Sequence, residues 1–361
     1  MMPRPSLRDA LKGLRRRSRS LFSQALTTVA GTRRYATALA PESVSSVLIC
    51  RLNGRIGNTM FLTPLIRELH ELLPDAAIDL AIGYRAGSEL LGALPGVRRV
   101  IVFPHRSPLR IGRYVAALRE VRKERYSLAI DPIPESTSGH ALLSLARARY
   151  RLGFSGPGQW APLTHAVPVP GEVAHRALQP LYLACRIFGA AWPPPRQELF
   201  LALSPEELAA GQALIAQAIG PGPQPGRDVV GFFAHATHRK ALGREWWLAF
   251  WEAYLALEPR AIPVEFLPSP ATAPIRADII GIHVPSTRAL AAAIASTRLF
   301  VSADAGPMHL ASATPVATIG LFKVTDPALF GPLKPVDRVI DIVRHSPAEA
   351  AEICHRAWLA Q

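Results

Sequence analysis

The sequence lacks several features that mark whole classes of protein. Only three cysteines occur among 361 residues, and they are scattered rather than spaced as metal ligands. This favours a reducing compartment in which each thiol is a small core residue. No apolar run reaches the roughly 18 residues of a membrane-spanning helix, and no apolar segment of a secretory signal follows the basic N-terminus. We therefore expect a cytoplasmic protein without a membrane span.

Other motifs are missing as well, and their absence excludes common enzyme classes. The eleven histidines fall in no metal-ligand spacing, so no metal site is predicted. The sequence contains neither the Gly-x-x-x-x-Gly-Lys-Ser/Thr phosphate loop of many NTPases nor the Gly-x-Ser-x-Gly elbow of many hydrolases. No basic face interleaved with aromatic residues occurs in the body of the chain, which makes nucleic acid the least favoured partner.

Acidic residues are scarce compared with basic ones, and the excess charge is unevenly placed. The net charge is +14, and residues 1–34 contribute +8 of it through nine Lys or Arg and one acid, Asp9. Leucines at helical spacing accompany these charges, a combination that suits the anionic surface of a membrane. We predict that residues 1–42 form a tail that holds the protein at the cytoplasmic face of the inner membrane. A solubilising tail without a further role is the alternative.

Along the rest of the chain, short apolar runs alternate with amphipathic stretches. Strands are expected at residues 46–52, 77–82, 99–103, 126–131, 228–234, 262–267, 299–302 and 316–322. Helices are expected at 88–94, 111–124, 172–188 and 246–257, and also from Thr59, Ser204, Pro307 and Ser346. Pro64 should kink the helix from Thr59 or confine it to its early turns. Strands that alternate with helices predict parallel βαβ units.

A stiff proline-rich segment, Trp192-Pro-Pro-Pro-Arg196, is the predicted join between two α/β domains. The expected units are a first domain at 43–192, a second domain at 193–345 and a terminal helix at 346–361. Open parallel sheets bind ligands beyond the carboxyl ends of their strands, so the loops at those ends are expected to face one site. These loops are 53–58, 131–137, 235–244, 303–309 and 323–327.

The most informative stretch is Ser302-Ala-Asp-Ala-Gly-Pro-Met-His-Leu310. It predicts the end of a strand, a tight loop of small residues and a short helix beginning at Pro307. A helix N-terminus behind such a loop favours an anion such as a phosphate, and His309 would add a donor or a positive charge. The alternative is an ordinary corner at which Asp304 caps the helix.

Together with Gly320-Leu-Phe322 and Thr325-Asp-Pro327, this stretch resembles the donor-site signature of glycosyltransferase family 9, the heptosyltransferase-like enzymes of bacterial lipopolysaccharide assembly. The segment Ile56-Gly-Asn-Thr-Met-Phe-Leu-Thr-Pro-Leu-Ile-Arg67 resembles the glycine loop and helix with which that family opens, so the resemblance spans roughly residues 45–342. It implies the GT-B architecture, in which two Rossmann-like parallel-sheet domains face a central cleft.

The resemblance also implies an activity. The first domain would bind an acceptor and the second a nucleotide-sugar donor, most closely an ADP-heptose. The enzyme would transfer a heptose or related sugar to a lipid-linked saccharide in lipopolysaccharide or other envelope polysaccharide biosynthesis, with no metal or other cofactor. Two other interpretations stay open: a catalytically impaired family member that acts as a nucleotide-sugar-binding or scaffold protein, and an unrelated two-domain α/β binding protein.

On the donor side, the departing diphosphate needs cations or N–H dipoles to stabilise its charge. The resemblance implies that the donor-binding residues are Thr237, Lys240, Asp304, Ala305, Gly306, Pro307, His309, Thr325 and Asp326. Lys240 is the predicted cation, with Arg239 and Arg244 as rivals, although the family's Lys-x-Trp-Pro pattern is loosened here. The family's acidic contact to the nucleotide ribose has no evident equivalent between Pro268 and Asp278.

On the acceptor side, the resemblance implies a loop that includes Arg55, Gly57 and Thr59. Many members carry an Asp where this sequence has Asn58, and that Asp is thought to deprotonate the acceptor hydroxyl. An amide cannot accept a proton at neutral pH, so Asn58 would orient the hydroxyl, and it is also expected to cap the following helix. Asp131 is predicted to share the catalytic role. The candidates for the base are Asp131, Glu135 and His105; catalysis by donor positioning and leaving-group stabilisation alone is the other possibility.

Overall fold

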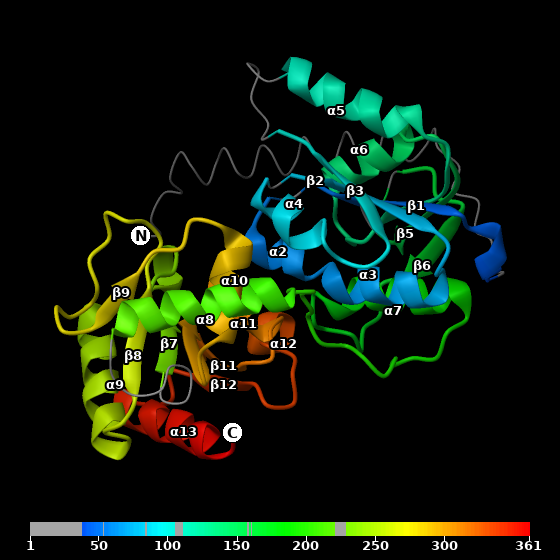
Figure 1. Cartoon of the computed structure of the whole chain (residues 1–361). Helices are drawn as coiled ribbons and strands as arrows, with labels where there is room; N and C mark the ends of the chain where they lie inside the picture. The colour runs from blue at the N-terminus through cyan, green and yellow to red at the C-terminus, as the bar shows by residue number, and fades with distance from the viewer. Residues whose placement is uncertain are drawn as a thin grey trace, which may run out of the picture.

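The computed structural model describes residues 38–52, 54–83, 85–104, 111–156, 159, 161–220 and 229–361. Most of the basic tail and the candidate base His105 lie outside these residues. The described chain forms two parallel sheets of six strands each (Figure 1). Their strand orders are β3-β2-β1-β4-β5-β6 and β12-β11-β10-β7-β8-β9. The predicted pair of parallel α/β sheets is therefore confirmed.

The first half of the chain builds the first sheet and the helices around it. Its strands are β1 (Ser46–Arg51), β2 (Ala77–Ile82), β3 (Val97–Val102), β4 (Tyr126–Asp131), β5 (Ala148–Ser155) and β6 (His165–Pro168). Its helices are the short η1 (Pro41–Ser43), then α2 (Ile56–Met60), α3 (Thr63–Leu72), α4 (Ala86–Leu91), α5 (Ile111–Lys123), α6 (Thr137–Leu145) and α7 (Leu178–Phe188).

The second half repeats the pattern. Its strands are β7 (Val229–Phe233), β8 (Ile262–Phe266), β9 (Ile280–Ile282), β10 (Leu299–Ala303), β11 (Ala317–Phe322) and β12 (Arg338–Asp341). Its helices are α8 (Pro205–Ile219), η3 (His238–Lys240), α9 (Arg244–Leu257), α10 (Thr287–Ala295), α11 (Gly306–Ser312), α12 (Pro327–Phe330) and α13 (Pro347–Leu359). None of the helices in the described ranges is both long enough and apolar enough to cross a bilayer.

Two helix predictions were wrong in detail. The helix expected from Thr59 is two helices, because the chain bends at Phe61 and Leu62, and Pro64 occupies the first turn of α3, where its missing N–H costs no hydrogen bond. The helix expected at 172–188 begins only at Leu178. The preceding residues instead reach the second half, where the Arg176 N–H donates to the carbonyl of Leu329.

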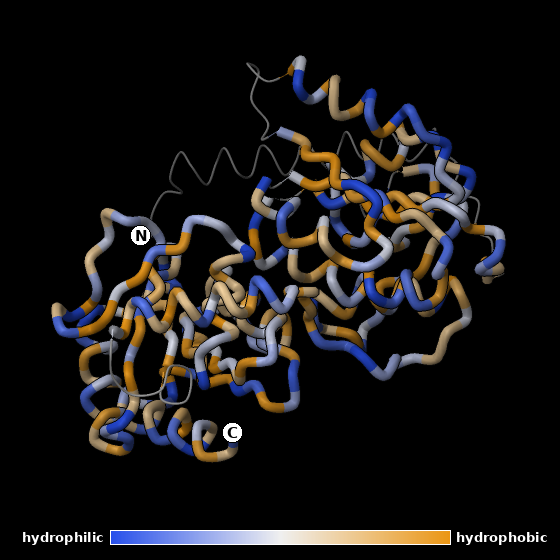
Figure 2. Tube along the Cα trace, in the orientation of Figure 1, coloured by the Kyte–Doolittle hydropathy of each residue, from blue (hydrophilic) through white to orange (hydrophobic). Residues whose placement is uncertain are grey.

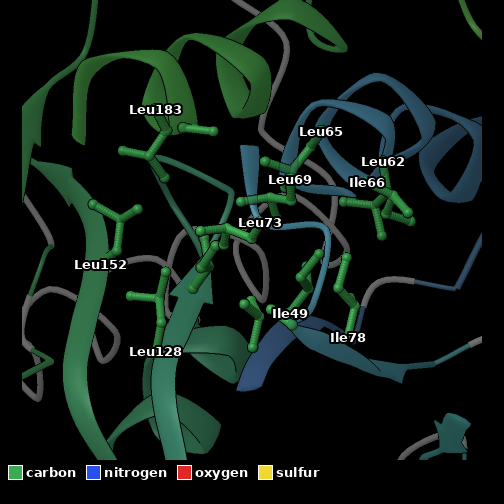
Figure 3. Close-up of a cluster of buried hydrophobic side chains, with 14 of the residues drawn as sticks. Ile49, Leu62, Leu65, Ile66, Leu69, Leu73, Ile78, Leu128, Leu152 and Leu183 are labelled. Atoms are coloured by element: carbon green, nitrogen blue, oxygen red, sulfur yellow. The ribbon is translucent and has the colours of Figure 1, made fainter. Parts of the chain in front are cut away.

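Leucine and isoleucine side chains on both sides of the first sheet form its core. Figure 3 shows one part of this core, in which α3 and α7 cover the sheet. Leu65 and Leu69 of α3 are fully buried there beside Ile49 of β1 and Leu128 of β4. Each such side chain stabilises the fold by about 1.5–3 kcal/mol relative to exposure to water. The most apolar stretches in Figure 2 are accordingly the strands, which are covered on both faces.

Aromatic side chains fill the core on one face of the second sheet. Trp247, Trp251 and Tyr254 of α9 are almost fully buried and pack in one cluster with Trp358 of α13. The terminal helix therefore belongs to the second core. Both predicted capping boxes are present: Ser204 with Glu207 begins α8, and Ser346 with Glu349 begins α13.

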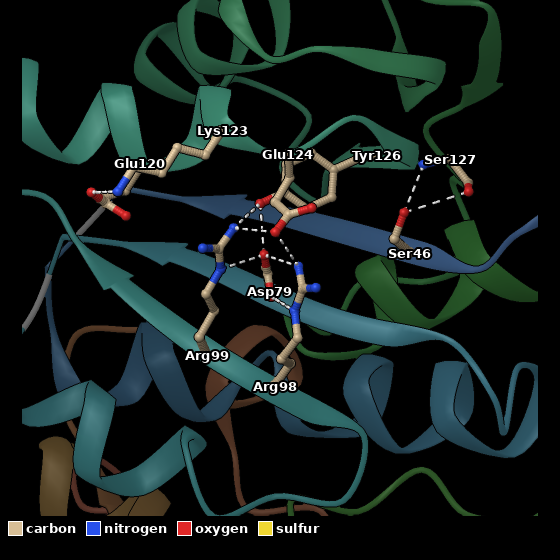
Figure 4. A network of polar contacts seen from close by, with 9 residues as sticks. All are labelled: Ser46, Asp79, Arg98, Arg99, Glu120, Lys123, Glu124, Tyr126 and Ser127. Atoms are coloured by element: carbon tan, nitrogen blue, oxygen red, sulfur yellow. Dashed lines mark hydrogen bonds and ion pairs between the residues drawn. The ribbon is translucent and has the colours of Figure 1, made fainter.

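A polar network fixes the amino-terminal side of the first sheet (Figure 4). The Asp79 carboxylate is fully buried in β2 and accepts hydrogen bonds from Arg98 (2.8 and 2.9 Å), Arg99 (2.7 Å) and the Tyr126 hydroxyl (2.7 Å). Burial acts to raise the pKa of Asp79, but the hydrogen bonds from Arg98, Tyr126 and Arg99 outweigh it and hold the pKa below its usual value. This network contributes to structure, because it lies away from the strand ends where a ligand would bind.

Candidate active site

The two halves of the chain meet where α2 of the first contacts α11 of the second (Figure 1). Both helices follow the carboxyl end of a central strand, β1 and β10 respectively. Glycines allow the close approach. A Cβ added at Gly57 would lie 2.5 Å from the Cδ2 atom of His309, and one added at Gly306 would lie 3.2 Å from the Cβ of Ile56. The predicted glycine loop and the predicted donor loop are therefore direct neighbours.

Three loops of the second half converge on the Asp304 carboxylate. Lys240, from the loop after β7, places its Nζ 2.7 Å from Asp304 Oδ2, and the Thr325 hydroxyl, from the loop after β11, donates to the same oxygen. Asp304 is buried, whereas Lys240 keeps 32% of its side chain exposed. Asp304 does not cap α11, because the N-cap residue is Ala305 and no side-chain cap hydrogen bond forms. The alternative of a simple helix cap is therefore wrong.

His309 lies in the first turns of α11 and is only 6% exposed. Burial lowers its pKa to about 4, against the opposing effect of Asp304 and with further lowering by His175 and Lys240. The imidazole is therefore neutral at pH 7 and acts as a hydrogen-bonding group rather than as a cation. Its Nδ1 atom has no hydrogen-bond partner in the described structure. The ring packs edge to face on Phe61 at 4.8 Å between centroids.

The other predicted donor-side residues take different roles. Ala305 is the N-cap of α11, and Gly306 is its first residue, so the helix begins one residue before the expected start at Pro307. Asp326 is exposed and caps α12 by accepting a hydrogen bond from the Ala328 N–H at 2.9 Å. Thr237 is exposed, and its carbonyl accepts from the Lys240 N–H.

Of the two rival cations, Arg239 is exposed and Arg244 donates from Nε to the Ile275 carbonyl at 2.8 Å. Lys240 is therefore the cation that lies against Asp304.

The end of α11 is fixed as firmly as its beginning. At the C-terminal end of α11, where a positive charge is favourable, the Lys334 ammonium donates to the carbonyls of Ala311, Ser312 and Thr314 at 3.1, 3.1 and 2.7 Å. Asp337 lies 3.3 Å from the same ammonium and also accepts from the Ser312 hydroxyl. This network holds the loop at the start of α11 in place through the helix itself.

Sequence reasoning missed an acidic residue beside the loop that follows β7. Glu265 of β8 is fully buried, accepts a hydrogen bond from the Ile275 N–H at 2.7 Å and lies 3.2 Å from Nε2 of His235. The stretch from Pro268 to Asp278, in which the sequence shows no equivalent of the family's acidic contact, lies beyond this strand. The available signal was a glutamate inside the apolar run Ile262–Phe266, since a buried charge needs a partner.

The acceptor-side loop begins at Arg55, whose carbonyl accepts hydrogen bonds from both the N–H and the hydroxyl of Thr59. Thr59 is buried in α2. Asn58 is the third residue of α2, and the N-cap is Arg55. The expectation that Asn58 caps this helix is therefore wrong, and its amide is left to face a cavity.

That cavity has a volume of about 510 Å³. It is lined by Arg51, Asn58, Pro132, Ile133, Pro134, Glu135, Ser155, Gly156, Val169, Arg176, Gln179 and Phe330. All but Phe330 come from the first half, and most follow the ends of β1, β4, β5 and β6. The cavity thus combines polar donors, two arginines and one carboxylate with an apolar wall from the second half.

Asp131 lies outside the set of lining residues. It is fully buried at the end of β4, its Oδ1 accepts from the Ile133 N–H, and its Oδ2 lies 3.6 Å from Nε2 of His140. Burial raises the pKa of Asp131 to about 8, although hydrogen bonds from Ile133 and Ser136 and the charge of Arg51 act against it. Asp131 is therefore largely protonated at neutral pH.

Arg51 is a further residue that sequence reasoning missed. It is the last residue of β1, is 7% exposed, and its Nε has no hydrogen-bond partner in the described structure. Burial lowers its pKa to about 10; Asp131 opposes this effect and Arg176 adds to it. The signal was an arginine at the end of an otherwise apolar strand.

Within the described residues, no group of three or more His, Cys, Asp or Glu is arranged to hold a metal ion. The polar groups at the junction are instead single donors, a lysine and a neutral imidazole. Such groups can hold an anion without a metal.

Comparison with known proteins gives this geometry a context. A family model described as "Glycosyltransferase family 9 (heptosyltransferase)" matches residues 114–355. No curated protein sequence matches the chain.

Among solved structures, the chain resembles the family 9 glycosyl transferase of Veillonella parvula (TM-score 0.73, 16% identity, covering 88% of this chain and 98% of that one). It also resembles two Escherichia coli enzymes. The first is heptosyltransferase WaaC, solved with ADP (TM-score 0.68, 16% identity, covering 86% of this chain and 99% of that one). The second is ADP-heptose LPS heptosyltransferase II (TM-score 0.69, 18% identity, covering 87% of this chain and 99% of that one). The TM-scores show a shared fold despite the low identities, and the GT-B architecture predicted from the sequence is confirmed.

Proposed function

The chain belongs to glycosyltransferase family 9, and from this membership we propose that it transfers a heptose or related sugar from a nucleotide-sugar donor to a lipid-linked saccharide. The donor that we favour is an ADP-heptose, because the E. coli structural relatives are described with ADP and with an ADP-heptose analogue. The acceptor would belong to lipopolysaccharide or another envelope polysaccharide.

The observation that carries the proposal is the convergence of Lys240 and Thr325 on Asp304, at the start of the helix whose His309 lies against the glycine loop of the first half. When the acceptor hydroxyl attacks the anomeric carbon of the sugar, the bond to the diphosphate breaks and negative charge grows on the leaving group. Preorganised cations and donors stabilise that charge most strongly in a site that excludes water. Lys240 supplies the cation, and the loop before α11 supplies N–H groups.

In this proposal the second half, from residue 193 to 345, binds the donor, and the first half, from 43 to 192, binds the acceptor in the 510 Å³ cavity. Because Lys240 and the N–H groups before α11 would stabilise the diphosphate, we expect the reaction to need no metal. The basic tail of residues 1–42 would keep the protein on the cytoplasmic surface of the inner membrane, because its positive charge is attracted to anionic lipids.

A thermal-shift panel with ADP, UDP, GDP and CDP and their common sugar conjugates tests the donor site. A ligand that binds the native state raises its melting temperature by mass action. We expect ADP and ADP-heptose to stabilise the protein, and Lys240→Ala and His309→Ala to reduce the shift, whereas Lys123→Ala, on the exposed face of α5, should leave it unchanged. A folded protein that responds to none of the nucleotides would overturn the proposal.

A second candidate is a family member that binds the nucleotide sugar but does not transfer it. The observation that favours it is Asn58, since the amide that faces the cavity cannot accept a proton. Nucleotide binding without transfer by the wild-type protein, combined with transfer by Asn58→Asp, would support this candidate.

A further inference from the structure

One carboxylate remains where a base for the acceptor hydroxyl would have to lie. Among the described residues that line the 510 Å³ cavity, Glu135 carries the only carboxylate, and it shares the cavity wall with Asn58. Its side chain is exposed, so solvent and ligand can reach it. A general base must come within hydrogen-bond reach of the proton that it removes, which requires a place on the wall of the cavity that holds the acceptor.

The other acids near the junction do not meet it. Asp131 is fully buried, and its Oδ2 packs against Gly139 of α6, where an added Cβ would lie only 2.4 Å away. It is not among the residues that line the cavity. Asp304 is engaged by Lys240 and Thr325 on the donor side. Asp326 caps α12.

The described histidines at the junction are equally unsuited. His175 uses both ring nitrogens, because Nδ1 accepts from the Ala177 N–H and Nε2 then donates to the Gly331 carbonyl at 3.0 Å. His309 is buried against Gly57 and Phe61. Neither residue lines the cavity.

The backbone around Glu135 is held more tightly than an ordinary loop. Pro132 and Pro134 fix their own φ angles and restrict the residues before them. The Ile133 N–H donates to the Asp131 carboxylate at 3.2 Å, and the Ser136 hydroxyl caps α6 by accepting from the Gly139 N–H at 2.9 Å. A catalytic side chain gains from such fixed support, because little reorganisation is then needed during the reaction.

We propose that the Glu135 carboxylate is the general base that replaces the family's aspartate in this chain, an assignment that rests on the transfer activity proposed above. The acceptor O–H, oriented by the Asn58 amide, gives its proton to Glu135 while its oxygen forms the new bond to the anomeric carbon. The bond from that carbon to the diphosphate breaks, and the nucleoside diphosphate leaves with the electron pair. Glu135 then returns the proton to solvent.

The test measures transfer from ADP-heptose to heptose-free lipopolysaccharide. We expect Glu135→Gln to lower kcat by about 10²–10⁴-fold, the usual contribution of a general base, with the KM for the donor and the nucleotide thermal shift unchanged. Glu135→Asp should retain part of the activity. Glu352→Gln, the same change on an exposed part of α13, should match the wild type.

The decisive variant is the double substitution Asn58→Asp with Glu135→Gln. A carboxylate restored at position 58 should bring kcat back to within about tenfold of the wild type, since one well-placed base suffices. A merely structural role for Glu135 would not be rescued in this way.

The pH profile adds a second readout: the acid limb of kcat/KM should disappear in Glu135→Gln and persist in Asp131→Asn. The other charged groups among the described residues that line the cavity are Arg51 and Arg176.

Three results would overturn the assignment. The first is full activity of Glu135→Gln, which would leave His105 or substrate positioning to do the work. The second is a wild type that is inactive while Asn58→Asp transfers sugar, since the chain would then lack a base. The third is nucleotide binding without transfer by either protein, which would remove the role of Glu135 but leave the donor site standing. Loss of nucleotide binding itself would contradict the proposed function instead.

Discussion

Burial decides what the ionisable residues at this junction can do. His309 and Asp131 would both carry a charge or titrate near neutrality in water, yet burial lowers the pKa of His309 to about 4 and raises that of Asp131 to about 8. Both are consequently uncharged or largely uncharged at pH 7. The sequence identifies both residues as ionisable. Only the packing around them shows that burial removes the positive charge expected of His309 and the negative charge that a base at Asp131 would need.

These shifts predict how stability depends on pH. His309 and His140 have pKa values lowered to about 4, so the unfolded chain binds protons that the native state does not, and stability is lost as the pH falls from about 6.5 to 4. Asp131 acts in the opposite direction: its raised pKa favours the native state at low pH, and that contribution is lost as the pH rises from about 4 to 8. Below about pH 6.5, the two histidines together outweigh Asp131, so stability rises with pH. Above that pH only Asp131 still titrates and stability falls, so these three residues place the stability maximum near pH 6.5.

Urea unfolding at pH 5, 6.5 and 8 measures this balance. We expect the free energy of unfolding to fall from pH 6.5 to 8 by at most about 1.4 kcal/mol per pH unit for a single group. Asp131→Asn should remove this decline and leave the decline below pH 6.5 in place. An unchanged slope above pH 6.5 in Asp131→Asn would show that Asp131 is ionised in the native protein.

At the scale of elements, the parallel strands were the easiest part to predict. β1, β4, β10 and β11 are short apolar runs that end in polar loops, and their positions agree with the structure to within one or two residues. β5 was missed because Arg149 and Arg151 interrupt its apolar pattern, although Arg151 finds carbonyl acceptors at Leu143 and Ala146. Whether such a segment forms a strand depends on tertiary contacts, which the local sequence does not encode.

The candidate site shows the same division. The turns that precede α11 and α2 were located from their motifs, because glycine and proline at fixed spacing have a local structural reason. Arg51, Glu265 and the exclusion of Asp131 from the cavity could not be found in this way. Each depends on which side of a strand end a side chain occupies once two sheets have packed together.

The contact between α2 and α11 predicts that Gly57 tolerates no side chain. In Gly57→Ala, the new methyl group would meet the His309 ring at 2.5 Å, and we expect a loss of about 1–3 kcal/mol in stability from overpacking. The nucleotide thermal shift should weaken too, because His309 is displaced. Gly112→Ala is the matched control: it lies in α5 with nothing within 4 Å of the new atom, so it should stabilise the helix by up to about 1 kcal/mol. Equal melting temperatures for the two variants would contradict the close approach.

At the scale of the whole molecule, the site and the joint between the two halves are the same region. Residues from both halves form one buried cluster that includes Phe61 and Leu310. The connecting segment, which runs from the end of α7 to the start of α8 (residues 189–204), contributes Leu199 and Leu201 to this cluster. The Leu201 N–H donates to the Ala313 carbonyl. Each sheet also has a core of its own, so the stability of the joint can be separated from the stability of either half.

Phe61 is the side chain that tests this separation. It is 1% exposed and packs against His309 at 4.8 Å and Phe330 at 6.2 Å from the second half, and against His175 at 5.7 Å from the first. We expect Phe61→Ala to cost about 3–5 kcal/mol, and to uncouple the unfolding of the two halves because the lost contacts cross the joint.

Two optical signals can follow that uncoupling. Four of the six tryptophans, Trp246, Trp247, Trp251 and Trp358, lie in the second half, so fluorescence reports mainly on that half, whereas far-UV circular dichroism reports on both. In the wild type the two unfolding curves should coincide, as two-state behaviour requires, and in Phe61→Ala they should separate. Phe103→Ala removes a ring of equal size and burial whose aromatic partner, Tyr114, lies in the same half, so its two curves should shift together. Coincident curves in Phe61→Ala would mean that the connecting segment, rather than this aromatic cluster, couples the two halves.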